Sequence, residues 1–257
     1  MLSYSRLGLN GRLGNQMFQY ASLRGIADCN GYNFGIPANH HQLFDVFEMA
    51  EACKNLNSSF PEQTFNEPHF HFDHNFMNGF PDNLDLFGYF QTEKYFKNIE
   101  NIIRKEFTFK PEILEAASRY ADVFKNNKVF SIHFRRTDYL NTPDAHPTPS
   151  QEYYQSAIDI FDDYDFGIVF SDDISWCRSL NMLNSDRFIF SHNHHFVDLY
   201  LMTQCNSNII ANSSFSWWGA WLNENNNKSV IVPPVWFGPK IGADTKDLIP
   251  EDWTILQ

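Results

Sequence analysis

The chain has 257 residues and an apolar content of 43%, enough for one large domain or two small ones with a sizeable core. Its net charge of −12 argues against nucleic acid or an anionic membrane as a partner, so local positive charge must hold any anionic ligand. Four cysteines without a C-x-x-C pair, no apolar leader before Asn10 and no run of about 18 apolar residues predict a cytoplasmic protein with reduced thiols and no transmembrane segment.

A glycine-rich loop over residues 8–16 opens the chain and leads directly into a predicted helix over 13–28. In that helix Met17, Phe18 and Ala21 recur at helical spacing. Glycines let backbone N–H groups approach an anion or a sugar closely, and a helix N-terminus carries partial positive charge. The spacing matches neither G-x-G-x-x-G nor a phosphate loop with Lys-Ser/Thr. The loop is therefore either a sugar or anion site or only a tight turn before the helix.

The rest of the N-terminal half gives weaker patterns. We expect a strand over 32–36 and helices over 95–107 and 110–125. Residues 58–87 are rich in Pro, Asn, Phe and His, and their pattern predicts no element. Asn126-Asn127 then forms a turn, which places the domain boundary so that the two domains cover residues 1–126 and 127–257.

The C-terminal half alternates between short apolar runs and helical patterns. We expect strands over 129–133, 166–170, 187–190, 208–211 and 229–232, and helices over 150–161, 174–183, 195–205 and 214–223. Strands that alternate with helices of about ten residues indicate βαβ crossovers and a parallel sheet. This half therefore predicts a complete Rossmann-like α/β domain.

The segment from His133 to Asp138, His-Phe-Arg-Arg-Thr-Asp, follows the first of these strands. Two arginines at the end of a buried strand are costly unless an anion lies there, and guanidinium groups can fork onto the oxygens of a diphosphate. Ligands of open α/β sheets bind at the carboxyl ends of the strands. The sequence thus predicts a diphosphate site at Arg135 and Arg136, and the alternative is an Arg–Asp pair that only fixes a loop.

Two other strand ends carry polar residues. Asp172 is suited to accept from ribose hydroxyls or a guanine edge, whereas Asp173 is expected to cap the helix that begins near Ile174. The run from Asn212 to Trp221 opens the next helix, where hydroxyls and free N–H groups suit a phosphate. The serines of this run are the ligand candidates, and its tryptophans are expected in the core.

Two histidine clusters are candidates for a zinc site: His69, His71 and His74, and His192, His194 and His195. Neither matches H-E-x-x-H, and neither has an obvious carboxylate or thiolate partner. Surface or core histidines are favoured, so we expect no metal site.

Three segments together resemble the motif set of the alpha-1,2-fucosyltransferase family, and they occur in that family's order: residues 11–20, the block at 133–138, and residues 213–218. The resemblance implies an α/β, GT-B-like fold of two Rossmann-type halves, with an acceptor-side N-terminal domain and the complete parallel sheet in the C-terminal domain. It also implies inverting, metal-independent transfer of L-fucose from GDP-fucose to O2 of a terminal galactose. The donor and a glycan acceptor would be the partners, with no further cofactor.

The resemblance also assigns roles to residues. Arg135 would be the main diphosphate ligand, Arg136 would support it, and His133 would lie near the nucleotide. The phosphates and the fucose would be held by Ser214, Phe215 and Ser216, and the reacting centre would be faced by Arg12, Gly14 and Asn15. An inverting enzyme is expected to use a base near the acceptor, for which Asp138 is the first candidate. Two alternatives stay open: Asp138 is only a structural partner of Arg136, or the departing phosphate takes the proton.

Two other functions fit part of the sequence. One is a transferase that uses another nucleotide sugar, such as GDP-mannose. The other is a carbohydrate-binding protein without catalysis, since an aromatic content of 17% also suits sugar stacking. The arginine pair and the βαβ half argue against the second, because a lectin needs no diphosphate site.

Overall fold

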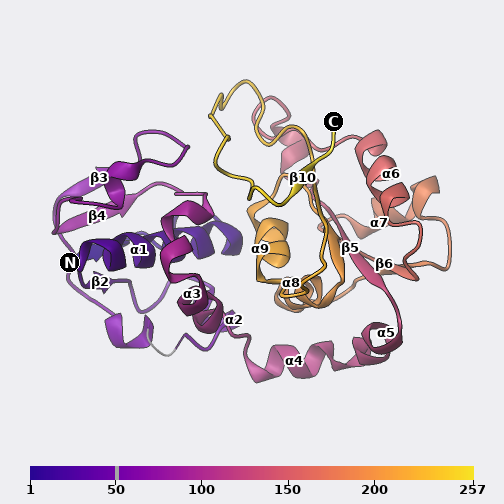
Figure 1. Ribbon diagram of the computed structural model, residues 1–257, viewed down its shortest axis with the longest axis horizontal. Coiled ribbons are helices and arrows are strands. Elements are labelled where there is room, and N and C mark those ends of the chain that lie inside the picture. The colour runs from indigo at the N-terminus through magenta and orange to yellow at the C-terminus, as the bar shows by residue number, and fades with distance from the viewer. Residues whose placement is uncertain (50–51) are drawn as a thin grey trace. The chain divides into compact units, whose positions relative to one another are not determined.

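The computed structural model describes residues 1–49 and 52–257, and the chain divides into two compact units (Figure 1). The first unit comprises Met1–Lys110 and Ala243–Pro250, and the second comprises Pro111–Gly242 and Glu251–Gln257. Each unit contains its own parallel sheet. No helix among the described residues combines the length and the hydropathy that crossing a membrane requires.

The second unit is built on a six-stranded parallel sheet with the strand order β10-β9-β8-β5-β6-β7. The strands are β5 (Val129–Phe134), β6 (Phe166–Ser171), β7 (Phe188–Phe190), β8 (Ser207–Ile209), β9 (Val230–Val232) and β10 (Thr254–Ile255). The helices are α4 (Pro111–Ala117), α5 (Ala121–Asn126), α6 (Gln151–Ile160), α7 (Ile174–Arg178), α8 (His195–Gln204) and α9 (Ser214–Leu222), with short 3₁₀ turns η5 (Ser118–Tyr120), η6 (Tyr139–Asn141) and η7 (Asn181–Leu183). The predicted alternation of strands and helices is confirmed, but the helix predicted over 174–183 ends at Arg178 and is followed by η7. The sixth strand, β10, was not predicted, because its two residues are exposed and show no apolar pattern.

Strand order reverses at the centre of this sheet. After β5 the chain adds β6 and β7 on one side, and β8 and β9 then form on the other side. All six residues of β5 are buried, as expected for a central parallel strand. The gap between the carboxyl ends of β5 and β8 is therefore the topological switch point, where open α/β sheets bind ligands.

Aromatic side chains fix helices α6 and α9 against the sheet. The Tyr153 hydroxyl donates to the carbonyls of Ile210 (2.7 Å) and Ile231 (3.0 Å), and Tyr154 donates to the carbonyl of His133 (2.9 Å). Trp217 and Trp218 on α9 are fully buried, which confirms that the tryptophans belong to the core. These contacts hold the ends of β5 and β8 in place.

The first unit has a four-stranded parallel sheet, in the order β2-β1-β4-β3, within the described residues. Its strands are β1 (Leu2–Ser3), β2 (Phe34–Gly35), β3 (Thr64–Asn66) and β4 (Leu84–Phe87). Its helices are α1 (Leu13–Asn30), α2 (Leu43–Val46) and α3 (Glu100–Glu106), with 3₁₀ turns η1 (Ala52–Asn55), η2 (His74–Phe76), η3 (Glu93–Tyr95) and η4 (Lys97–Ile99). Both units are therefore α/β with a parallel sheet, as the sequence predicts.

Four expectations for the first half need correction. Residues 58–87 contain β3, η2 and β4, whose three to four residues are too short to show a period of two. The predicted helix over 95–107 is divided into the end of η3, then η4 and α3, and the predicted strand over 32–36 is only β2. The predicted helix over 110–125 is interrupted by η5 and groups with the second unit.

Helix α1 packs closely against the backbone near η3, and a glycine makes this possible. A Cβ on Gly25 would lie 2.0 Å from the carbonyl oxygen of Tyr95 and 2.7 Å from Cα of Phe96. Real Cβ atoms do not approach backbone so closely, so the helix or the 3₁₀ turn must shift if the methyl is added.

We expect Gly25→Ala to lower the free energy of unfolding by about 1–3 kcal/mol, because overpacking outweighs the gain in helix propensity. Denaturant titration measures this change. Cys29→Ala, at an exposed position of the same helix, is the control and should change stability by less than about 0.5 kcal/mol. Equal stability of the two variants would show that the close packing of α1 is absent.

Candidate functional site

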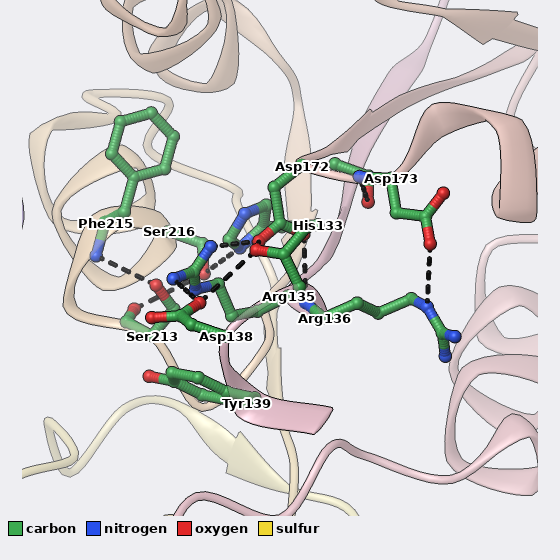
Figure 2. Close-up of polar contacts among 12 residues, drawn as sticks. His133, Arg135, Arg136, Asp138, Tyr139, Asp172, Asp173, Ser213, Phe215 and Ser216 are labelled. Carbon is green, nitrogen blue, oxygen red and sulfur yellow. Dashed lines mark hydrogen bonds and ion pairs between the residues drawn. The ribbon is translucent and has the colours of Figure 1, made fainter. Parts of the chain in front are cut away.

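A cluster of charged and aromatic residues lies at the carboxyl ends of β5, β6 and β8 in the second unit. Figure 2 shows side chains from three segments: the end of β5 and the loop after it, the residues directly after β6, and the start of α9. Parallel pairing of β5 with β6 and with β8 brings these three strand ends to one edge. The cluster therefore lies at the switch point of the sheet.

Arg135 is held between two carboxylates and an aromatic ring. Its guanidinium donates to Asp172 and to Asp138, and its Cζ lies 4.9 Å from the centre of the Tyr139 ring. The Arg135 side chain is only 11% exposed. Because a guanidinium stacked on a ring and paired on both sides loses rotamer freedom, its position is fixed before any ligand binds.

Arg136 points away from Arg135, as Figure 2 shows. Its guanidinium lies 3.5 Å above the Trp176 ring of α7 and 3.4 Å from a carboxylate oxygen of Asp173. Asp173 also accepts from the Trp176 N–H (3.1 Å), which confirms that it caps α7. The two adjacent arginines thus face different surroundings, and Arg136 anchors the loop to α7.

Asp172 receives several donors from the loop after β5. The Thr137 hydroxyl (2.6 Å), the Arg136 N–H (2.9 Å) and the Arg135 guanidinium all donate to its carboxylate. Partial burial opposes its ionisation, but the Thr137 hydroxyl, the Arg135 charge and the Arg136 N–H hold the pKa of Asp172 below its usual value. Asp172 is therefore ionised at neutral pH, and its hydrogen bonds fix the shape of the Arg135 loop.

His133 connects β5 to helix α9. Its Nδ1 lies 2.8 Å from Oγ of Ser216, and its ring centre lies 5.6 Å from that of Phe215. Burial lowers the pKa of His133 to about 3, so the imidazole is neutral at physiological pH. Ser213 caps α9 by accepting from the Phe215 N–H (3.3 Å). The first turn of α9, with its partial positive charge, is thereby held beside the end of β5.

Tyr139 and Asn212 support the cluster, and no motif in the sequence assigns either residue a specific role. The Tyr139 hydroxyl donates to the carbonyl of Asn212 (3.2 Å), directly before the cap of α9. The Asn212 amide donates to the carbonyls of Pro147 (2.7 Å) and Trp236 (2.9 Å). Tyr139 therefore joins the Arg135 loop to the start of α9. The sequence feature that could have indicated Tyr139 is its position directly after the His-Phe-Arg-Arg-Thr-Asp block.

The first unit places the other predicted site residues on the loop that begins α1. Arg12 is exposed and precedes the helix, and Gly14 and Asn15 lie in its first turn. Asn15 Oδ1 accepts from the side-chain amide of Gln91 (2.8 Å), a residue that the sequence did not indicate. The loop is shaped by Gly8 and Gly11, whose φ angles of 91° and 98° favour glycine.

The two histidine clusters show no arrangement of metal ligands. Among the described residues, no group of three or more His, Cys, Asp or Glu side chains is placed to hold a metal ion. His69 and His71 stack face to face with ring centres 3.9 Å apart, a geometry that does not converge their nitrogens on one point.

Solved structures with the same fold include POFUT1 in complex with GDP, with a TM-score of 0.57 and 12% identity, covering 89% of this chain and 97% of that chain. A second is the fucosyltransferase NodZ from Bradyrhizobium, with a TM-score of 0.56 and 13% identity, covering 85% of this chain and 91% of that one. These likenesses confirm the predicted GT-B-like fold of two Rossmann-type halves.

The chain belongs to Glycosyl transferase family 11, whose model matches residues 4–256. An alpha-1,2-colitosyltransferase of Escherichia coli is 30% identical over 97% of both chains. The Homo sapiens galactoside alpha-(1,2)-fucosyltransferase 1 is 26% identical, and the match covers 83% of this chain but 64% of that protein. The resemblance inferred from the three motifs is thus confirmed.

The neutral state of His133 has a measurable consequence. A histidine whose pKa is lower in the folded state than in the unfolded state stabilises the fold above its unfolded pKa of about 6.5, and this contribution is lost as the pH falls. We expect His133→Asn to lose less stability than the wild type between pH 7.5 and pH 5, as measured by denaturant titration. His192→Asn, at an exposed histidine, should follow the wild type. The same pH dependence in all three proteins would contradict a buried neutral His133.

Proposed function

We propose that the protein transfers L-fucose from GDP-fucose to O2 of a terminal galactose of a glycan, with inversion and without a metal ion. The observation that carries this proposal is Arg135, fixed at the sheet edge beside the N-terminus of α9. In support, a solved structure of NodZ, with a TM-score of 0.52 and 14% identity, was soaked with GDP-fucose. The galactoside fucosyltransferases among the relatives favour the galactose acceptor.

The donor site would use one guanidinium and one helix terminus. As the bond between fucose C1 and the phosphate oxygen breaks, negative charge develops on the diphosphate. Arg135 would neutralise this charge, with Arg136 fixing its loop, and the first turn of α9 would donate through Ser214, Phe215 and Ser216. Neutral His133 and anionic Asp172 would lie near the nucleotide.

The pairing of Arg135 with two carboxylates sets a condition on this donor site. A diphosphate would take over part of the guanidinium that Asp138 and Asp172 occupy. Asp138 is half exposed, whereas Asp172 is tied to Thr137 and to the Arg136 N–H. We therefore propose that Asp138 yields its place to the diphosphate and Asp172 keeps Arg135 oriented.

The group that takes the proton from the acceptor hydroxyl is less constrained by the observed contacts than the donor site is. An Asp138 carboxylate released from Arg135 would be able to accept the proton of the acceptor hydroxyl, which keeps it as the proposed base. Transfer of that proton to the departing phosphate is the alternative. Arg12, Gly14 and Asn15 would face the reacting centre from the first unit.

A second donor is supported by a specific relative. The Escherichia coli alpha-1,2-colitosyltransferase matches this chain over 97% of both lengths. Colitose differs from fucose by the absence of the 3-hydroxyl, so both sugars present the same C1 leaving-group chemistry. Initial rates with GDP-fucose, GDP-colitose, GDP-mannose and UDP-galactose, on lactose and N-acetyllactosamine, separate these donors. Linkage to O2 is read from the product by NMR.

We expect Arg135→Ala to lower kcat/KM by about two decades, since a diphosphate-binding guanidinium contributes roughly 3 kcal/mol to transition-state stabilisation. Steady-state kinetics measures the loss, and circular dichroism checks that the fold is retained. Arg119→Ala, at an exposed arginine of the same unit, is the control and should keep wild-type turnover. Near-normal turnover of Arg135→Ala would remove the central role proposed for this residue.

Metal independence gives a separate prediction. Transfer is expected to continue at an unchanged rate in excess chelator, because guanidinium and helix N–H groups would stabilise the leaving diphosphate. A rate that collapses with chelator and returns with added Mg²⁺ or Mn²⁺ would contradict this part of the proposal.

Binding of GDP tests the non-catalytic alternative. GDP at 100 times its dissociation constant should stabilise the protein by about 2.7 kcal/mol, seen as a raised melting temperature. A protein that only binds carbohydrate would show no such shift.

A further inference from the structure

The first unit contains a half-buried carboxylate, Glu67, that the proposed mechanism does not use. It follows β3, and its backbone N–H donates to the carbonyl of Phe87 at the end of β4 (2.8 Å). Its two carboxylate oxygens accept from the backbone N–H groups of Tyr89 (2.6 Å) and Phe90 (3.0 Å), which follow β4. Glu67 therefore clamps the chain where it leaves the sheet.

The segment that Glu67 clamps, Gly88–Gln91, has a constrained backbone conformation. Phe90 has a φ angle of 50°, a left-handed conformation that is rare for an aromatic residue. A Cβ on Gly88 would lie 2.5 Å from Oε2 of Glu67, so only glycine leaves room for the carboxylate. The position of Glu67 and the path of this segment thus depend on each other.

The same segment holds the loop that begins α1. The Tyr89 hydroxyl donates to Oδ1 of Asn10 (3.1 Å), and the Gln91 amide donates to Oδ1 of Asn15 (2.8 Å). Gln19 joins the two by donating both to the Asn10 carbonyl (3.0 Å) and to the Gly88 carbonyl (3.1 Å). Each contact lies within the first unit.

We propose that Glu67 is a positioning residue: through residues 88–91 it fixes Asn10 in the loop before α1 and Asn15 in the first turn of α1, which would face the reacting centre. This inference rests on the proposed function, in which Arg12, Gly14 and Asn15 lie near the acceptor. In this proposal Glu67 itself does not contact the substrate.

The protonation state of Glu67 controls the clamp. A carboxylate accepts both N–H groups with charge assistance, whereas a carboxylic acid has fewer acceptor lone pairs. Burial raises the pKa of Glu67 to about 7, although the Tyr89 and Phe90 N–H groups lower it. The clamp is therefore complete above neutral pH and weakens as the pH falls below about 7.

Two tyrosine hydroxyls that face Glu67 do not titrate in the same range. They belong to Tyr4, which follows β1, and to Tyr95 of η3. Burial raises the pKa of each hydroxyl above its usual value, and the negative charge of Glu67 adds to this effect. Tyr89 lies beside Tyr4, and Arg6 is stacked on the Phe87 ring. Asp85 of β4 is bound by Ser3 and Ser5.

The test compares wild type, Glu67→Gln and the exposed control Glu62→Gln in transfer assays between pH 5.5 and 8.5. In wild type and Glu62→Gln we expect kcat/KM for the acceptor to rise through pH 7. In Glu67→Gln, whose amide resembles the protonated acid, that rise should disappear, with kcat/KM at pH 8 reduced about tenfold. GDP affinity should stay within about twofold of wild type, because the proposed donor site lies in the second unit.

Gly88→Ala provides a second route to the same state, since the added methyl displaces the carboxylate. It should also flatten the pH profile, with retained GDP binding showing that the protein is folded. A wild-type profile in both variants would overturn the proposal.

Hydrogen exchange separates this inference from the proposed function. If the wild type transfers no sugar, the proposed function fails. Faster exchange of backbone amides in residues 8–16 and 88–91 of Glu67→Gln, at pH 8, would still support the clamp. Unchanged exchange there would overturn the clamp, whether or not the wild type is active.

Discussion

The second unit depends on one electrostatic constraint: a guanidinium must be kept in place at the end of a buried strand. Arg135 meets this constraint by lying between the carboxylates of Asp138 and Asp172 and against the Tyr139 ring. The same constraint explains Thr137 and the Arg136 N–H, which hold Asp172. Since the net charge is −12, the overall field of the protein repels anions, and any anionic ligand would have to be held by fixed local positive charge.

The core and the site are built from the same aromatic residues. Tyr154 packs against Phe134 on β5 and donates to the carbonyl of His133, while Tyr139 contacts both Arg135 and the carbonyl before α9. Each ring fills apolar space and still places a hydroxyl on a backbone oxygen. A high aromatic content therefore serves packing and positioning together, and it does not by itself indicate sugar stacking.

The first unit follows a similar rule with a different group. There a carboxylate, Glu67, accepts from backbone N–H groups where the chain leaves β4. Asparagine and glutamine side chains then connect this segment to the start of α1 by hydrogen bonds. Neutral amides suit a surface that would meet sugar hydroxyls, because they donate and accept without a permanent charge. The two units thus differ in chemistry, which agrees with the proposed division into a donor side and an acceptor side.

The sequence by itself determined the α/β alternation of residues 129–232, the cap at Asp173, the buried tryptophans of α9 and the family, because these features depend on local periodicity and on short motifs. It did not determine β3, β4 or β10, whose few residues form strands only when a neighbouring strand supplies hydrogen bonds. Tertiary structure alone decided that Arg135 and Arg136 diverge, since Trp176 and Asp173 draw the second arginine to α7. It also decided that Glu67 meets Tyr89 and Phe90, because parallel pairing of β3 with β4 joins residues about twenty positions apart.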